Sequence, residues 1–209
     1  MQMKVTQTDC DLTLDRERLK EEIRSTYGRV AEEPNGEFHF HRGPEYAASM
    51  LGYDRAELDA LPDAVTAPFA GVGNPFQAGP FPRGSRVIDL GSGSGMDCLL
   101  AARRVGPEGE VVGLDMTDAM LRTAAAGAAA IGADHVRFER TDIANLPFDN
   151  ASVDVAISNG VINLSPEKAR VFAELYRVVR RGGRVQFADI VLDAELSAGA
   201  RNDIELWVG

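Results

Sequence analysis

One stretch, residues 86–95, constrains the fold more than any other part of the chain. It reads Arg-Val-Ile-Asp-Leu-Gly-Ser-Gly-Ser-Gly: an apolar, β-branched run that favours a strand, then glycines at alternate positions. Residues 96–104 continue with a helical apolar face. Glycines let the backbone approach a ligand closely, and a helix start offers unpaired N–H groups. A strand, a glycine turn and a helix in this order therefore predict a nucleotide-binding α/β domain.

Asp115 strengthens this prediction. It ends a second apolar run, residues 111–114, and follows Gly95 by twenty residues. A carboxylate at that place accepts hydrogen bonds from both hydroxyls of a ribose. A tight structural turn that binds no ligand is the weaker alternative.

The spacing of the glycines indicates which nucleotide is bound. Dinucleotide binders use Gly-x-Gly-x-x-Gly, so that a pyrophosphate sits on the helix start. This chain instead has Asp-x-Gly-x-Gly-x-Gly from Asp89 to Gly95. The pattern resembles the S-adenosylmethionine (SAM) loop of class I methyltransferases. In that family the turn holds the methionine end of the cofactor, and a carboxylate suits its ammonium group.

The chain divides by composition into three parts. Residues 1–67 are expected to form an N-terminal helical extension or lid, residues 68–84 a connector, and residues 85–209 the SAM-binding core. The connector holds four prolines and four glycines, so it is predicted to be neither helix nor sheet interior. Two interpretations of it stay open: a plain linker, or part of a lid across the cofactor cleft.

Apolar periodicity predicts the elements of the extension. Three helices are expected, near residues 13–33, 44–51 and 54–61. Thr13 or Asp15 is the cap of the first one. Residues 38–41 alternate like a short strand or an extended segment, which would point His39 and His41 the same way.

In the core, strands and helices alternate, which predicts an α/β fold: a doubly wound, mainly parallel sheet with helices on both faces. The strands expected after the first are residues 111–114, 135–139, 153–157 and 184–190. One helix is expected directly after the glycine turn, a second from Thr117 or Asp118, and a last one from near Ala194. Another is expected to begin at Ser165-Pro166 and to bury Val171, Leu175 and Val178. We expect Arg180 and Arg181 to complement a helix C-terminus that Gly182-Gly183 closes.

Four motifs resemble the arsenite methyltransferase branch of the SAM methyltransferases: residues 87–95, 113–117, 158–164 and 177–184. The resemblance runs from about Tyr27 to the end. It implies that the methionine end of SAM is held by Asp89, Gly91, Ser92, Gly93 and Gly95. It also implies ribose binding by Asp115, packing of Met116 on the adenine, Asp142 and Ile143 at the adenine edge, and Ser158 and Asn159 beside the sulfonium. Class I methyltransferases usually add two further strands, so either the fold is minimal or C-terminal strands are missing, and we favour a fragment.

The sequence departs from that branch where arsenic would bind. Its Gly-Cys-Gly-Asn-Pro and Ser-Asn-Cys-Val-Ile-Asn-Leu motifs carry cysteines, whose thiolates hold trivalent arsenic as soft ligands. Val72 and Gly160 stand at those positions here. Cys98 lies in an apolar helix and is interpreted as a core residue, and Cys10 lies in a terminal segment. The substrate of the branch therefore does not carry over, and we expect no methylation of arsenite.

Candidates for the acceptor side rest on weaker arguments. Methyl transfer from a sulfonium is a direct displacement, so alignment matters most, and a base is needed only if the nucleophile loses a proton. His39 and His41 are candidate bases, although exposed or structural histidines are the more common interpretation. Tyr27, Asn74 and Asn163 are polar residues expected near the cleft, and for the two asparagines a turn or capping role is an equal alternative.

The net charge of −10 argues against nonspecific binding to nucleic acid or to an anionic membrane surface. No apolar run reaches the length of a membrane span, so we expect a cytoplasmic protein. No metal site is predicted. The leading hypothesis is a SAM-dependent methyltransferase with a small-molecule methyl acceptor. The alternatives are a non-catalytic SAM-binding protein and a nicotinamide-dependent oxidoreductase, against which Asp89 and the early third glycine count. The oligomeric state stays open.

Overall fold

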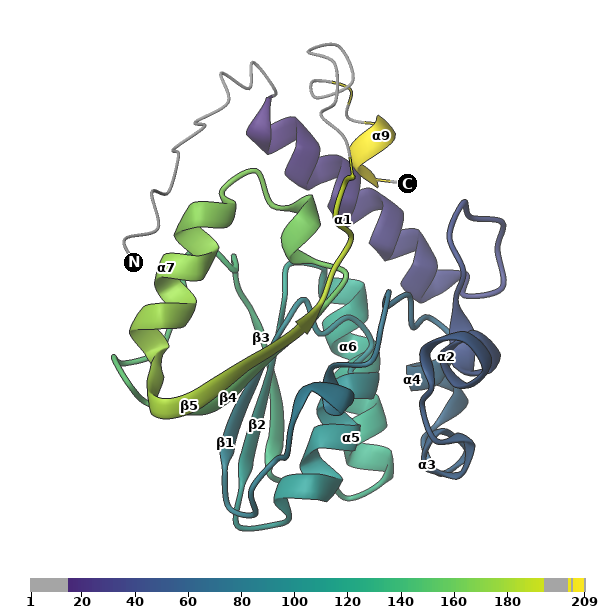
Figure 1. Cartoon of the computed structure of the whole chain (residues 1–209). Coiled ribbons are helices and arrows are strands. Elements are labelled where there is room, and N and C mark those ends of the chain that lie inside the picture. The colour runs from purple at the N-terminus through teal and green to yellow at the C-terminus, as the bar shows by residue number, and fades with distance from the viewer. Residues whose placement is uncertain (1–14, 194–202, 204, 209) are drawn as a thin grey trace.

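A computed structural model describes residues 15–193, 203 and 205–208 (Figure 1). The N-terminal part holds helices α1 (Arg16–Glu32), α2 (Gly43–Leu51), α3 (Arg55–Asp59) and α4 (Asp63–Thr66) and the 3-10 helix η1 (Pro75–Ala78). The strands are β1 (Arg86–Leu90), β2 (Glu110–Asp115), β3 (Val136–Arg140), β4 (Val153–Asn159) and β5 (Val179–Ala188). The remaining helices are α5 (Met96–Val105), α6 (Asp118–Ala130), η2 (Ile162–Leu164), α7 (Lys168–Val178) and α9 (Glu205–Val208). None of the described helices is long and apolar enough to cross a membrane.

The five strands form one parallel sheet in the order β3-β2-β1-β4-β5. The chain builds outward from β1 on one side and then crosses back to add β4 and β5 on the other. The strand order therefore reverses between β1 and β4, and in open α/β sheets ligands bind at the carboxyl ends of the strands at such a point. The predicted fold class is confirmed.

Alternating side chains of β1 divide the core into two layers. Ile88 and Leu90 face α7, and they pack with its buried residues Val171, Leu175 and Val178, as predicted. Val87 faces α5 and packs with Cys98, Ala101 and Val105. Helices α5 and α6 thus cover one face of the sheet and α7 covers the other (Figure 1).

Helix α1 confirms the first predicted helix, and Asp15 is its cap: the carboxylate accepts hydrogen bonds from the backbone N–H groups of Glu17 and Arg18, both at 3.1 Å. The helix buries Leu19, Ile23 and Val30 and lies against α6. Helices α2, α3 and α4 pack on α5 and α6 through a second cluster that contains Ala47, Leu58, Val65, Leu99 and Ala128. Both short helices expected near 44–51 and 54–61 are present, and α4 is an addition.

Two predictions in the extension and connector need correction. Residues 38–41 do not form the short strand that was one of the two predicted conformations: residues 39 and 40 are bends, and in the described chain no strand pairs with this segment. The connector, expected to contain no helix, forms η1. Asn74 caps it by accepting a hydrogen bond from the Phe76 N–H at 3.0 Å, and Pro75 stands at its first position, where no N–H is needed.

The prediction for Arg180 and Arg181 is wrong. Helix α7 begins at Lys168 rather than Ser165 and ends at Val178, and β5 begins at the next residue. Arg180 donates to the Asp154 carboxylate of the neighbouring strand at 2.5 Å, so its charge is used across strands rather than at the helix end. Gly182 (φ +77°) lies in an irregular stretch of β5, between the pairs Val153–Val179 and Val155–Arg184.

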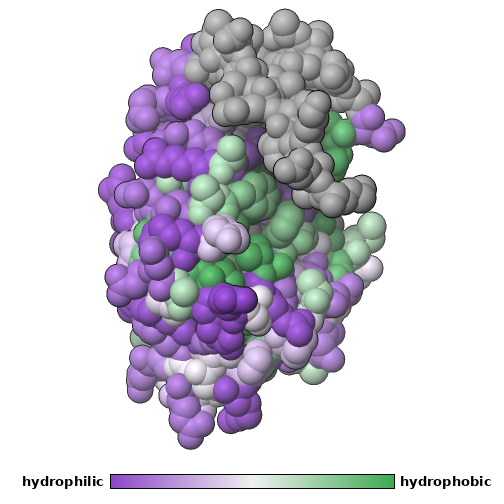
Figure 2. Space-filling view, turned by 60° about the vertical axis from the view of Figure 1, so that its left-hand side comes forward, coloured by the Kyte–Doolittle hydropathy of each residue, from purple (hydrophilic) through white to green (hydrophobic). Residues whose placement is uncertain are grey.

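Apolar side chains are exposed on α7 and β5. The face that Figure 2 turns forward carries an apolar area bordered by hydrophilic residues. Phe172 of α7 and Phe187 of β5 are in edge contact, with ring centroids 5.9 Å apart. Both remain partly exposed, as does Val185, and Tyr176 is almost fully exposed. At the C-terminal end, Leu206 is exposed while Trp207 packs against Leu19 and Ile23. The helix expected from Ala194 starts outside the described residues.

Candidate active site

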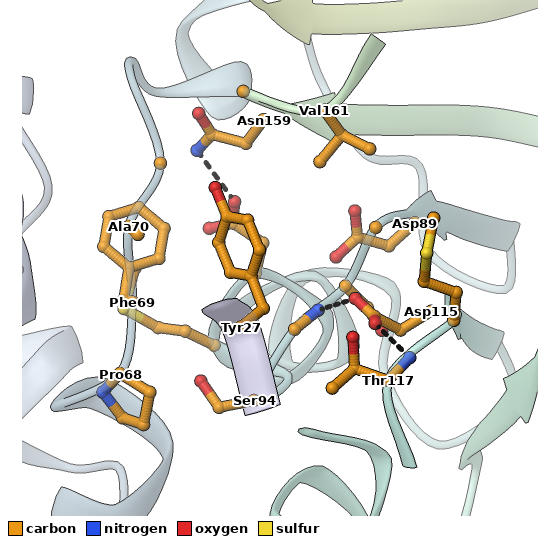
Figure 3. A pocket seen from close by; sticks show the side chains of 18 of the residues that line it. Tyr27, Pro68, Phe69, Ala70, Asp89, Ser94, Asp115, Thr117, Asn159 and Val161 are labelled. Atoms are coloured by element: carbon orange, nitrogen blue, oxygen red, sulfur yellow. Dashed lines mark hydrogen bonds between the residues drawn. The ribbon is translucent and has the colours of Figure 1, made fainter. Parts of the chain in front are cut away.

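A pocket lies at the carboxyl ends of β1, β2 and β4, beneath α1 (Figure 3). Its empty volume is about 850 Å³, counted to its open mouth. One wall, which we call the cofactor side, consists of Asp89, residues 91–94, 96–97 and 115–117. The opposite wall, the acceptor side, consists of residues 68–71, 160–161 and 164 together with Tyr27. The connector thus contributes a wall of the pocket, which favours the lid interpretation over a plain linker.

The glycine turn lies where the sequence predicts it and requires its glycines. Gly91, Gly93 and Gly95 have φ of +70°, +51° and +88°, values that side chains disfavour. A Cβ on Gly91 would lie 2.4 Å from a methyl group of Val161. The backbone of the turn is therefore pressed against the end of β4, and this contact joins the two sides of the pocket.

Asp115 is held at the edge of the pocket by two backbone N–H groups. Its Oδ2 accepts from Gly93 at 2.9 Å and its Oδ1 from Thr117 at 2.8 Å. Burial raises the pKa of this carboxyl, and the bonds from Thr117 and Gly93 oppose the rise. Each oxygen keeps a further acceptor position, so the carboxylate has the capacity to bind two hydroxyl groups.

Two more carboxylates lie under the glycine turn. Asp89 and Asp97 are 2% and 5% exposed, so nearly all their contacts are with protein or with the contents of the pocket. Burial raises the pKa of Asp89 well above its usual range, and the charge of Asp97 adds to the rise. Burial raises the pKa of Asp97 to about 6, against hydrogen bonds from Asn159 and Tyr53. Among the lining residues of the described chain there is no Lys, Arg or His.

These features fit the cationic end of SAM. Three carboxylates without a lining cation favour a ligand that carries positive charge. Ser92 Oγ is buried without a protein partner at the same turn, so it is free to bind a polar ligand atom. Asp97 was not among the predicted residues, although its place in the first turn after the glycines was the signal that could have found it.

The two residues predicted beside the sulfonium differ in their surroundings. Ser158 is buried, donates to the Leu90 carbonyl oxygen at 3.1 Å and lies outside the lining residues. Asn159 lines the pocket, but its side-chain amide is bound to protein groups: it accepts from the N–H groups of Val72 and Gly73 and donates toward Tyr53, Gly73 and Asp97.

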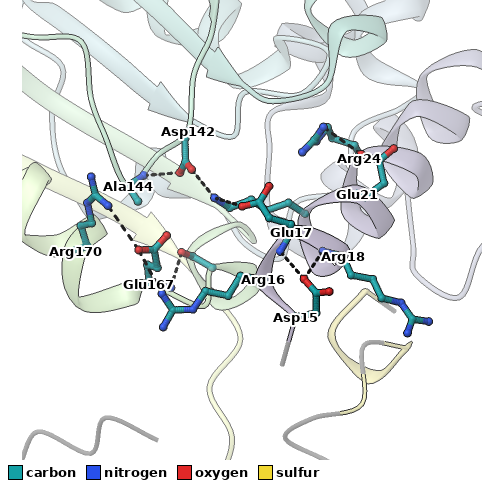
Figure 4. A network of polar contacts seen from close by, with 12 residues as sticks. Asp15, Arg16, Glu17, Arg18, Glu21, Arg24, Asp142, Ala144, Glu167 and Arg170 are labelled. Atoms are coloured by element: carbon teal, nitrogen blue, oxygen red, sulfur yellow. Dashed lines mark hydrogen bonds and ion pairs between the residues drawn. The ribbon is translucent and has the colours of Figure 1, made fainter. Parts of the chain in front are cut away.

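At the expected adenine end, Met116 and Ile143 line the pocket together with Thr117 and Thr141. Asp142 does not. Its carboxylate accepts from Lys20 Nζ of α1 at 2.8 Å and from the Ala144 N–H at 2.9 Å (Figure 4). Burial of Asp142 is outweighed by these bonds, so its pKa is lowered. This pair ties α1 to the loop after β3.

The five residues predicted as candidates for the acceptor side differ in whether they line the pocket. Tyr27 lines the pocket, and burial, with a smaller contribution from Asp115, raises the pKa of its hydroxyl to about 12. His39 and His41 are exposed on the surface and do not line the pocket. Asn74 caps η1, and Asn163 donates its backbone N–H to Asp189 at 2.9 Å, both outside the lining residues. Of the five, Tyr27 alone lines the pocket and remains a candidate for contact with the methyl acceptor.

The two positions at which the resembling branch has cysteines are neighbours in space. A Cβ on Gly160 would lie 3.1 Å from Val72 Cγ1. Cys98, the cysteine in the described chain, is fully buried beneath the glycine turn and donates to Asp89 at 3.3 Å, and burial raises its pKa well above the usual range. No group of three or more His, Cys, Asp or Glu side chains in the described residues is arranged to hold a metal ion.

Fold and pocket together define a nucleotide-binding, doubly wound α/β protein with a carboxylate-lined pocket at the sheet's point of reversal. A sequence model described as a methyltransferase domain matches residues 82–208. The chain therefore belongs to the methyltransferase-domain family and has the fold of class I SAM-dependent methyltransferases, whose methyl donor is SAM.

Individual relatives agree with this assignment. An arsenite methyltransferase of Halobacterium salinarum is 43% identical over 162 residues, which are 78% of this chain and 41% of that protein. An arsenite methyltransferase of Mus musculus is 28% identical over 92% of this chain and 53% of its own length. The crystal structure of an arsenic(III) SAM methyltransferase from Chlamydomonas reinhardtii matches with a TM-score of 0.65 and 41% identity, over 70% of this chain and 51% of that one. The chain thus spans about half the length of these relatives.

Proposed function

We propose that this chain binds SAM and transfers its methyl group to a small, uncharged molecule other than arsenite. The observation that carries the proposal is the set of three lining carboxylates around the glycine turn, two of them buried, with no cation among the described lining residues. Such a site favours a ligand with ribose hydroxyls and a positively charged end. The division into extension, connector and core and the cytoplasmic location stay predictions.

In this proposal the cofactor side performs the binding. Asp115 accepts the ribose hydroxyls, Asp89 and Asp97 face the cationic methionine end, and Met116 and Ile143 pack on the adenine. When bound, SAM supplies a methyl group on a sulfonium, which a nucleophile takes up by direct displacement. Because such a displacement depends on alignment, the rest of the pocket needs to hold the acceptor and exclude water.

The acceptor side is apolar apart from one hydroxyl. Phe69, Val161 and Leu164 line it, and Tyr27 contributes the hydroxyl group. With a pKa of about 12, Tyr27 remains protonated at neutral pH, so it donates a hydrogen bond to the acceptor rather than removing a proton. An acidic acceptor would find no cationic partner among the described lining residues, and we therefore infer an uncharged one.

The exclusion of arsenite rests on Val72 and Gly160. They are side by side where a pair of thiolates would be needed, and neither offers a donor atom to trivalent arsenic. The Cys98 thiol is fully buried and donates to Asp89, and burial raises its pKa so that it stays protonated. The arsenite activity in the names of the relatives is for this reason not transferred to this chain.

Calorimetry with SAM, S-adenosylhomocysteine and NADH tests the cofactor. We expect binding of the first two and none of NADH; binding of NADH alone would refute the proposal. Incubation with SAM, a thiol and arsenite, followed by chromatography of arsenic species, should give no methylated product above a blank. Formation of methylarsenic would overturn the exclusion. A non-catalytic SAM-binding protein is the alternative, and methylation of any small neutral acceptor separates the two.

A further inference from the structure

The side chain of Asn159 lies between the two sides of the pocket, and every polar atom of its amide is engaged. Oδ1 accepts from the N–H groups of Val72 at 2.8 Å and Gly73 at 3.1 Å. Nδ2 lies 2.9 Å from the Gly73 carbonyl oxygen, 3.0 Å from the Tyr53 hydroxyl and 3.1 Å from Asp97 Oδ2. The amide has one favourable orientation, because rotating it by half a turn would set its oxygen against a carboxylate and a carbonyl.

Three further observations show that the surroundings are built around this amide. Tyr53 is 6% exposed and donates its hydroxyl to Asp97 Oδ1 at 2.8 Å, so both oxygens of that carboxylate receive a donor. A Cβ on Gly71 would lie 2.4 Å from Asn159 Nδ2, so the connector approaches the amide as closely as a glycine allows. The Tyr53 ring in turn packs edge-on against Phe69 of the acceptor side, with centroids 5.4 Å apart.

We propose that Asn159 is a positioning residue that couples the two sides of the pocket: it holds the backbone of residues 72–73, which directly follow the acceptor-side residues 68–71, and, with Tyr53, holds the Asp97 carboxylate beneath the cofactor's cationic end. The coupling rests on the proposed function, because it assigns the cationic ligand to SAM. Asn159 thus acts through its neighbours and contributes no direct step to methyl transfer.

The charge state of Asp97 reports on this arrangement. The groups that act on it are Tyr53 and Asn159 as donors, Asp89 and Cys98 beneath the glycine turn, and Arg104 from the end of α5. The two donors lower the pKa of Asp97, which burial raises to about 6. Removing one donor raises it further, because a hydrogen bond to the ionised form is lost. At neutral pH more of the carboxyl is then protonated, and a cationic ligand binds more weakly.

The test compares three variants of the full chain with the wild type. Asn159→Ala removes the hydrogen bonds to the backbone of residues 72–73 and one donor to Asp97. Tyr53→Phe removes the other donor to Asp97 and leaves the bonds to residues 72–73 in place. Asn74→Ala is the matched control, because Asn74 also anchors the connector, to Gly52 and Phe76, but does not contact Asp97. Two measurements are made without ligand: NMR titration of the Asp97 carboxyl carbon, and hydrogen exchange of the Val72 and Gly73 amides. SAM affinity is then measured by calorimetry from pH 5 to 8.

We expect the Asp97 midpoint to rise by about one pH unit in Asn159→Ala and in Tyr53→Phe, the size expected for one charge-assisted hydrogen bond. SAM affinity should begin to fall at correspondingly higher pH in both. Faster exchange of the Val72 and Gly73 amides should appear in Asn159→Ala alone. Asn74→Ala should leave the midpoint and these two amides as in the wild type.

An Asn159→Ala protein whose Asp97 midpoint matches that of Asn74→Ala would overturn the proposal, as would unchanged exchange at residues 72–73. If Asn159→Ala does not fold, Tyr53→Phe tests whether these donors stabilise the ionised Asp97 carboxylate. An Asp97 midpoint in Tyr53→Phe equal to that of the wild type would overturn this part of the proposal. Absence of SAM binding by the wild type at every pH refutes the proposed function instead, and the ligand-free measurements still decide the role of Asn159.

Discussion

The cofactor side and the acceptor side of the pocket are built in different ways. The cofactor side comes from two short stretches, each the end of a strand and the start of a helix, and its polar groups are held by nearby backbone, as Asp115 is by Gly93 and Thr117. The acceptor side is assembled from α1, the connector and the end of β4, which are far apart in the chain, and its lining is mostly apolar.

Because of this difference, the methyl donor and the methyl acceptor are recognised by different kinds of interaction. Hydrogen bonds to fixed backbone groups specify a ligand narrowly, whereas apolar walls discriminate mainly by shape and volume. The same donor site is thus compatible with acceptor walls of other composition. In this chain Gly160 of the wall and its neighbour Val72 stand at the two positions where the resembling branch has cysteines.

Gly91→Ala is expected to have the largest effect, because it disturbs both sides at once. A positive φ and a Cβ 2.4 Å from Val161 together predict a loss of about 3 kcal/mol of stability, or roughly 8 °C in Tm, and loss of S-adenosylhomocysteine binding. Gly132→Ala is the control, with φ +65° and open space around its Cβ. Thermal denaturation and calorimetry of both variants measure this, and equal effects would show that contact with Val161 is unimportant.

Asp115→Ala should affect the cofactor side alone. Loss of charge-assisted bonds to the ribose predicts S-adenosylhomocysteine binding weaker by about 30-fold, roughly 2 kcal/mol. Asp118→Ala, three residues on, removes an exposed carboxylate that pairs with Arg140 at 3.1 Å and should leave affinity unchanged. Calorimetry at one pH compares them, and an unaltered affinity in Asp115→Ala would remove the basis of the ribose assignment.

Val72→Cys combined with Gly160→Cys should change the acceptor side and leave the cofactor side intact. Two reduced thiols at adjacent positions predict arsenite binding at least about tenfold tighter than in either single variant, because trivalent arsenic binds several thiolates together. Calorimetric titration with arsenite measures the difference, and S-adenosylhomocysteine affinity serves as the internal control. Equal affinities in the single and double variants would contradict the adjacency of the two positions.

Lys20→Met should give the smallest effect, by removing the contact that ties α1 to the loop after β3. A partly exposed ion pair predicts a loss of about 0.5 kcal/mol, or about 1–2 °C in Tm. Arg24→Met, which breaks the pair with Glu21 inside α1 at 3.1 Å, is the control for loss of charge from the same helix (Figure 4).

The difference between Lys20→Met and the wild type should depend on pH. The pKa of Asp142 is lowered in the folded protein, so its contribution is present above about pH 4 and is lost as pH falls through the folded value. The pKa of Lys20 is raised, chiefly by the hydrogen bond to Asp142, so its contribution is present below about pH 10 and is lost as pH rises further. Melting curves at pH 3, 7 and 11 should therefore show the largest difference between Lys20→Met and the wild type at pH 7 and smaller differences at pH 3 and pH 11.

Much of the core was predictable because its signals are local. Strand, glycine turn and helix at residues 86–104 follow from periodicity and from residues that tolerate positive φ, and β2 ends at Asp115 as expected. One prediction that proved wrong, for Arg180 and Arg181, concerned a position where local signals compete. Two glycines and two arginines are typical of a helix end, but Asp154 on the adjacent strand binds Arg180 and the chain passes directly into β5.

By itself, the sequence determined the fold class, the position of the glycine turn and of Asp115 at the end of β2, and the absence of cysteines at positions 72 and 160. These depend on residues that are close in the chain or on residue type alone. Only the tertiary structure decided that Asn159 is bound to the connector and Asp97, that Asp142 pairs with Lys20, and that His39 and His41 lie outside the pocket. The reason is physical: these contacts join segments tens of residues apart, and which of them meet is settled by packing of the sheet and its helices.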